Sequence, residues 1–272
     1  MIYCIWYPSG GFGHYLNAII SLNGDNFFKP KGDLVFNQNG NSHEFPLAMP
    51  KYKDHISYTK PNLDPNKNYT VLIDNGINNE STNFLDFFPE ACVIKMCYDD
   101  VTWPVVAKTH IIKAMKSQIS TEMGVDPEKW PEQNAWAQRE KIFLYLRDHP
   151  LRNKWKPDTN MYNLMLNDLD SHDKIFSKLN SFGIKLSSFT DTWQQWWQKN
   201  HQYFLPIKQA QKIIDSVVNR DIVSLNNIHD TWDQAVIYYF IWLRFQKEVP
   251  HNDYANFFEN TAQIIDWVNN EN

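Results

Sequence analysis

The chain has little of what marks a small secreted protein. Only 3 of its 272 residues are cysteines, too few for a disulfide framework and an odd number that leaves at least one thiol unpaired. The sequence begins directly in an apolar run and shows neither the basic start nor the cleavage site of a signal peptide. We therefore expect a reducing compartment and predict a cytoplasmic protein.

Long hydrophobic runs and an excess of positive charge are also missing. No stretch of about 18 apolar residues occurs, so we expect no membrane span. The formal net charge of -5 disfavours broad nonspecific binding to nucleic acid, which needs a basic surface. No group of Cys and His residues has the spacing of zinc ligands, and we expect no metal.

The residues that are present indicate a globular α/β protein. The sequence is 43% hydrophobic and 15% aromatic, which is typical of a chain with a packed core. Apolar runs at 2–7, 69–74 and 91–98 are predicted to be buried strands. Because helical segments alternate with them, we predict parallel pairing through right-handed crossovers. The expected fold is a single α/β domain over residues 1–272, with a central, mostly parallel sheet and flanking helices.

The other segments carry weaker signals. In residues 24–68, the segments 34–36 (LVF) and 43–45 (HEF) flank Asn39-Gly40, which predicts an antiparallel hairpin excursion. Residues 149–272 are predicted to be the mainly helical part, with a surface loop at 149–160 and one short strand at 184–187. The run 141–146 fits either a strand or a helix. Helix-like spacing is found near 134–148, 171–182, 190–203, 206–220, 229–247 and 254–269.

The most informative stretch follows the first strand. There a glycine-rich turn leads into a helix, and glycines let the backbone approach a phosphate closely. A helix start also offers N–H donors and about half a positive charge. The spacing is neither that of a Walker motif nor that of the dinucleotide fingerprint. We predict an anion site, with a packing turn as the alternative. The predicted binding residues are Pro8, Ser9, Gly10, Gly11, Phe12, Gly13, His14 and Tyr15.

Two side chains near this edge are candidates for proton transfer. His14 falls in the first helical turn, where it could donate to a phosphate oxygen or act as a base; a surface or capping histidine is the alternative. Asp99 follows the third strand, at the edge where parallel sheets bind ligands; helix capping is the alternative. We expect His14 or Asp99 to take the proton of an acceptor.

Two cations complete the predicted site. Lys108 lies on the helix after the third strand and could reach a ligand phosphate, although exposed lysines on helices usually do nothing specific. Arg147 could clamp a phosphate or sulfate with two hydrogen bonds, or form a structural salt bridge with neighbours of Asp148. Trp193 and Trp197 are four residues apart and share a helix face. Packing is expected for this pair, with a stacking platform for a base or sugar as the alternative.

The stretch from Trp6 to Leu16, WYPSGGFGHYL, resembles the sulfotransferase-like branch of the P-loop nucleoside triphosphate hydrolase fold. In that family a first strand runs into a loop with proline and glycine and then into a helix. The loop binds the phosphosulfate end of 3'-phosphoadenosine 5'-phosphosulfate. Residues 91–118 are similar to the later strand and helix that contact the 3'-phosphate. The resemblance implies this co-substrate and transfer of a sulfuryl group to a hydroxyl of a small molecule or glycan.

Two other interpretations stay open. The stretch from Gly10 to Leu16 is also similar to the glycine loop of GDP-fucose-dependent fucosyltransferases. Residues 146–148 weakly resemble the basic motif of those enzymes. This implies a GDP-sugar-dependent glycosyltransferase. The third interpretation is a non-catalytic binding protein on the same fold. It is favoured because the loop lacks the lysine or arginine that the sulfotransferase-like family usually has there.

Overall fold

The computed structural model describes residues 1–8, 11–29, 63–74, 88–108, 135–187, 189–200 and 205–246. The chain divides into two compact units. The first unit comprises Met1–Asp99 and Trp155–Leu205, and the second comprises Asp100–Lys154 and Pro206–Asn272. One α/β domain over the whole chain stays a prediction, because compact units within one chain can belong to a single domain.

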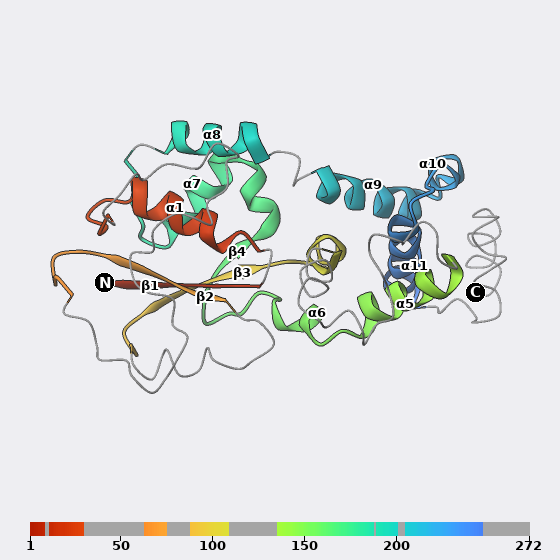
Figure 1. Cartoon of the computed structure of the whole chain (residues 1–272), viewed down its shortest axis with the longest axis horizontal. Coiled ribbons are helices and arrows are strands. Elements are labelled where there is room, and N and C mark those ends of the chain that lie inside the picture. The colour runs from red at the N-terminus through yellow and green to blue at the C-terminus, as the bar shows by residue number, and fades with distance from the viewer. Residues whose placement is uncertain are drawn as a thin grey trace. The chain divides into compact units, whose positions relative to one another are not determined.

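The first unit is built on a four-stranded sheet in the order β2-β1-β3-β4 (Figure 1). All three pairings are parallel, which confirms the predicted α/β sheet with flanking helices. The first three strands are the predicted ones. The fourth was not predicted, because four residues carry too little periodicity and its pairing with β3 defines it. The strands are β1 (Ile2–Tyr7), β2 (Tyr69–Asp74), β3 (Cys92–Cys97) and β4 (Tyr162–Met165).

Helix α1 (Gly13–Asn23) packs its apolar side against β1 and β2. Three fully buried polar side chains connect it to β2: Asn17, Ser21 and Thr70. The hydroxyl of Thr70 donates to Oδ1 of Asn17 at 2.5 Å, and the hydroxyls of Ser21 and Thr70 lie 3.0 Å apart. Because buried polar atoms need partners, this network helps to set the position of α1 along the sheet.

The rest of the first unit follows β4. The short 3-10 helix η1 (Leu166–Asp170) leads into α7 (His172–Ser181), and α8 (Thr190–Asn200) comes next. Helices α1, α7 and α8 lie on the same side of the sheet (Figure 1). The predicted strand at 184–187 is wrong. Leu186 forms an isolated antiparallel bridge with Gly24, the residue that follows α1. This segment therefore contacts the carboxyl end of α1 and is not a strand of the sheet.

The second unit is helical in its described part. Helix α5 (Ala135–Asp148) packs against α11 (Thr231–Phe245), which decides the run 141–146 in favour of helix. The predicted loop at 149–160 is interrupted by the short helix α6 (Leu151–Lys154). The predicted helices also include α9 (Leu205–Asn219), while α10 (Ile222–Asn226) was not predicted. The predicted helix 254–269 and most of the hairpin excursion lie outside the described residues.

Candidate functional site

A tight turn connects β1 to α1. The N–H of Gly11 donates to the carbonyl oxygen of Pro8 at 2.7 Å, which holds Gly11 next to the end of β1. Phe12 then adopts φ 59° and ψ 23°, a left-handed conformation that is uncommon outside glycine. The N–H of Leu16 makes the first bond of the helix, to the carbonyl of Phe12 at 3.0 Å. The N–H groups of the first turn therefore point out of the amino end of α1.

Close packing requires the glycines of this turn. A Cβ atom at Gly13 would lie 2.2 Å from Cγ of Tyr7, and a Cβ atom at Gly11 would lie 2.6 Å from Cδ of Pro8. Both distances are far below van der Waals contact. The turn therefore lets α1 pack directly on the end of β1, which is the role named above as the alternative to anion binding.

Aromatic rings surround the turn. Phe12 meets Trp196 edge-on with ring centroids 5.8 Å apart, and Tyr15 stacks on the same indole at 3.8 Å. Burial raises the pKa of the Tyr15 hydroxyl well above its usual value. His14 is half-buried and meets Tyr7 edge-on at 6.0 Å. The side chains of Phe12 and Tyr15 therefore pack against Trp196. Any predicted role in binding an anion would fall to the backbone N–H groups of these residues.

Two of the tryptophans of α8 are half-buried and lie together on one face of the helix. The rings of Trp193 and Trp197 stack with centroids 5.2 Å apart and planes inclined by 9°, which confirms that they share a helix face. Trp196 lies elsewhere on the helix and is 2% exposed. The tryptophan that anchors α8 to α1 is therefore Trp196, and a role for the outer pair in stacking on a ligand stays a prediction.

The amino end of α1 is electrostatically suited to an anion. Its first turn contains no acidic residue, and no side chain accepts a hydrogen bond as the helix cap at Phe12. The partial positive charge of the helix dipole is therefore not offset by side chains of the helix itself. This is the condition under which a phosphate or sulfate gains most from the first-turn N–H groups.

The strand order also indicates a ligand site near the amino end of α1. In the strand order β2-β1-β3-β4, β2 lies next to β1 in one direction across the sheet, and β4 lies next to β3 in the opposite direction. The carboxyl ends of β1 and β3 therefore form a topological switch point, where open α/β sheets bind their ligands. The half-buried Asp99 follows β3 at this edge. The predicted residues brought to the edge are Pro8, Gly11, Phe12, Gly13, His14, Tyr15 and Asp99, whereas Ser9 and Gly10 lie outside the described residues.

The two predicted cations belong to the second unit. Arg147 makes two bonds of 2.6 Å to the carboxylate of the adjacent Asp148, a salt bridge with Asp148 itself, whereas the alternative named above was a salt bridge with the neighbours of Asp148. The Nζ of Lys108 lies 3.9 Å from a carboxylate oxygen of Asp230 and 5.7 Å from the ring centroid of Trp232. Roles for either cation toward a ligand stay predictions.

Lys95, the fourth residue of β3, is a buried cation that no sequence pattern singled out. It is 5% exposed, and its Nζ donates to the carbonyl oxygen of Lys156 at 2.8 Å. The same nitrogen lies 5.3 Å from the ring centroid of Trp6, within reach of a cation–π interaction. The signal that could have found it was a lysine inside an otherwise apolar strand.

Cys97 ends β3 on the same face as Lys95. Its thiol donates to Oδ1 of Asn163 at 3.3 Å, and burial raises its pKa to about 11. Cys4 is also buried and its pKa is raised for the same reason. Cys92 is half-buried.

The three thiols should therefore differ in reactivity. Because the thiolate is the nucleophile, iodoacetamide near pH 8 is expected to modify Cys92 first, and Cys4 and Cys97 only after unfolding. Peptide mapping by mass spectrometry over time measures the order, and a urea-unfolded sample should label at all three positions. Equal rates at Cys92 and Cys97 in the folded chain would contradict the burial described here.

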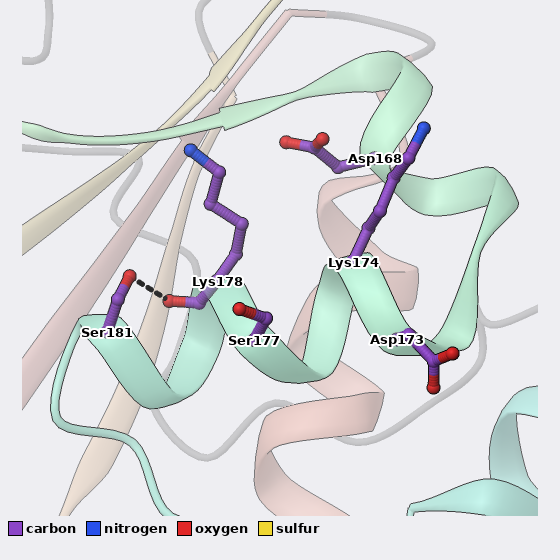
Figure 2. Close-up of a pocket in the computed structure, with 6 residues that line it drawn as sticks. All are labelled: Asp168, Asp173, Lys174, Ser177, Lys178 and Ser181. Atoms are coloured by element: carbon purple, nitrogen blue, oxygen red, sulfur yellow. Dashed lines mark hydrogen bonds between the residues drawn. The ribbon is translucent and has the colours of Figure 1, made fainter.

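A surface hollow of about 440 Å³ lies beside η1 and α7. Lys174 and Lys178 extend to either side of Asp168, whereas Asp173 points away from them (Figure 2). Asp168 accepts from the N–H of Met165 at 3.0 Å, and Lys174 lies 3.9 Å from a carboxylate oxygen of Asp170. The hollow is lined by different residues from the glycine turn.

Within the ranges that the structure describes, no cluster of three or more His, Cys, Asp or Glu side chains could hold a metal ion. In the same ranges, no helix combines the length and apolar character needed to span a bilayer. Comparison with protein-family models, with curated proteins and with solved structures gave no match.

Proposed function

We propose that the protein is a transferase with a P-loop, sulfotransferase-like fold that binds a phosphorylated nucleotide at the amino end of α1. The observation that carries the proposal is the glycine turn from β1 into α1 at the switch point of a parallel sheet. The uncapped positive end of α1 supports anion binding. The co-substrate is 3'-phosphoadenosine 5'-phosphosulfate, and the acceptor is a hydroxyl of a small molecule or glycan.

In the proposed reaction a sulfuryl group moves between two oxygens. The bond from sulfur to the 5'-phosphate oxygen breaks, and the acceptor oxygen forms a new bond to the same sulfur. The acceptor proton passes to His14 or Asp99, and adenosine 3',5'-bisphosphate leaves. First-turn N–H groups of α1 would stabilise the charge that develops on the phosphosulfate oxygens, which is usually the largest contribution to such transfers.

Calorimetric titration with adenosine 3',5'-bisphosphate tests the proposal. We expect heat of binding and a higher melting temperature, since a ligand at about 100 times its Kd stabilises the folded chain by about 2.7 kcal/mol. A His14→Ala variant should bind the nucleotide and lose turnover if His14 is the base. No heat and no thermal shift at millimolar nucleotide would rule out this co-substrate, and stabilisation by GDP instead would favour a glycosyltransferase.

A non-catalytic binding protein is the second candidate. Two observations favour it: the stretch from Pro8 to Tyr15 contains no Lys or Arg, and Arg147 forms a salt bridge with Asp148. Binding of adenosine 3',5'-bisphosphate without sulfate release from the phosphosulfate donor, across a panel of hydroxyl acceptors, would support this candidate over the transferase.

A further inference from the structure

The surface hollow beside η1 and α7 has the size and the lining of a site for a polar ligand (Figure 2). Its volume of about 440 Å³ is in the range of small-molecule sites. Every residue that lines it is charged or a serine, and all of them belong to η1 and α7 of the first unit. A ligand in the hollow would therefore be bound by hydrogen bonds and charge.

Lys178 supplies the hollow with a cation that no described carboxylate pairs with. Its side chain is half-buried, and toward the residues that the structure describes its ammonium makes neither an ion pair nor a hydrogen bond. Lys174, one helical turn earlier, is exposed and lies 3.9 Å from Oδ1 of Asp170. Because Asp170 partly neutralises Lys174, an anionic group gains most from a bond to Lys178.

Asp168 supplies an acceptor to the same hollow. Its Oδ2 accepts from the N–H of Met165 at 3.0 Å, which holds the carboxylate in place, and its Oδ1 bonds to none of the described residues. In Figure 2 the carboxylate points toward Lys178, and Lys174 lies on its other side. These three described side chains form no ion pair with one another, so the space between them is open to a ligand.

The arrangement of charge limits what the ligand carries. Asp168 lies between the two lysines and would repel a ligand with several negative charges, whereas Asp173 points away and contacts Nδ1 of His172 at 3.1 Å. An amino group is disfavoured at Asp168 because Lys174 and Lys178 flank it. A hydroxyl is a neutral donor that an ionised carboxylate accepts from strongly. The lining therefore favours one anionic group together with hydroxyl groups.

We propose that this hollow binds a monosaccharide that carries a single anionic group, either a phosphate or a carboxylate. The anionic group lies at the ammonium of Lys178 and the exposed hydroxyl of Ser177, and hydroxyls of the sugar donate to Asp168. Lys174 adds a weaker attraction. The inference does not rest on the proposed function, because it uses neither the glycine turn nor a nucleotide.

An NMR titration of the full-length chain labelled with nitrogen-15 tests the proposal. The probes are glucose 6-phosphate, glucuronate, inorganic phosphate and glucose. We expect a sugar with an anionic group to shift the amide resonances of residues 174–181 and to bind more tightly than inorganic phosphate or glucose, since only such a sugar contacts Lys178 and Asp168 together. Whichever of the first two probes binds more tightly identifies the anionic group.

Two variants and a control assign the binding to these side chains. Lys178→Met should weaken binding of the tighter anionic sugar by about 10-fold to 100-fold, the range for loss of one charge-assisted bond. Asp168→Asn keeps an oxygen for the N–H of Met165 and removes the negative charge. It should therefore strengthen binding of inorganic phosphate and reduce the preference for the sugar. Lys185→Met removes an exposed lysine that does not line the hollow and should bind like the wild type.

The proposal is overturned if millimolar probes leave the amides of α7 unshifted, or if inorganic phosphate binds as tightly as both anionic sugars. A folded Lys178→Met chain with wild-type affinity, or an Asp168→Asn chain with the full preference for the sugar, also overturns it. Shifts at residues 13–16 in place of α7 would refute the hollow and support the anion site of the proposed function. Should Lys178→Met not fold, the comparison of the four probes on the wild type decides the question.

Discussion

Replacing Gly13 by alanine is expected to lower the free energy of unfolding by about 3 kcal/mol, at the upper end of the usual range for overpacking. The added Cβ would lie 2.2 Å from Cγ of Tyr7. That carbon is where the ring joins the side chain of a β1 residue, so the ring cannot turn away without moving α1 off the sheet. Urea denaturation followed by circular dichroism measures the loss.

Gly183→Ala is the matched control for this variant. Gly183 has φ +79°, and a Cβ built there meets nothing within 4 Å. Its replacement therefore imposes only the strain of a left-handed residue, roughly 1 kcal/mol. If Gly13→Ala proved no more destabilising than Gly183→Ala, the close contact between Tyr7 and the start of α1 would be refuted, together with the packing role of the turn.

Replacing Trp155 by alanine is expected to lower the free energy of unfolding by about 3–5 kcal/mol, the range for emptying a large buried aromatic site. Trp155 is 0% exposed, and its ring centroid lies 5.0 Å from that of Trp6. The change leaves a cavity under the carboxyl half of β1, on the face of the sheet that carries Lys95. Urea denaturation of the variant, compared with the wild type, gives the value.

Trp155→Phe separates packing from hydrogen bonding at this position. The indole Nε1 of Trp155 is buried with no hydrogen-bond partner among the described residues. Phenylalanine keeps an aromatic ring and removes that unsatisfied N–H, so the loss should be well below that of the alanine variant. A phenylalanine variant as unstable as the alanine variant would show that the indole N–H does form an important bond.

Much of the first unit follows from local sequence patterns. The runs 2–7, 69–74 and 91–98 predicted three strands, and each is found within a residue of its predicted bounds. The glycine turn predicted the start of α1, where Gly13 is the first residue. Such elements are predictable because alternation, apolar runs and turn residues act over a few neighbouring positions.

The candidate site was only partly predictable. The turn and Asp99 are at the expected edge, because parallel strands end together. Lys95 was missed because a lysine in a strand gives no sign of whether it faces water or the core until its neighbours are known. Arg147 has Asp148 as its partner, a geometry that depends on the rotamers of two adjacent residues and not on their order.

The sequence alone determined that β1 runs through a glycine turn into α1, since both the apolar strand and the turn are local properties of the chain. Tertiary structure decided the rest: that β4 joins β3, that Trp196 and not Trp193 packs on α1, and that Lys95 lies buried beside Trp6. The physical reason is that pairing register and side-chain burial depend on residues far apart in the chain. A local sequence pattern does not indicate which of these distant residues will be in contact.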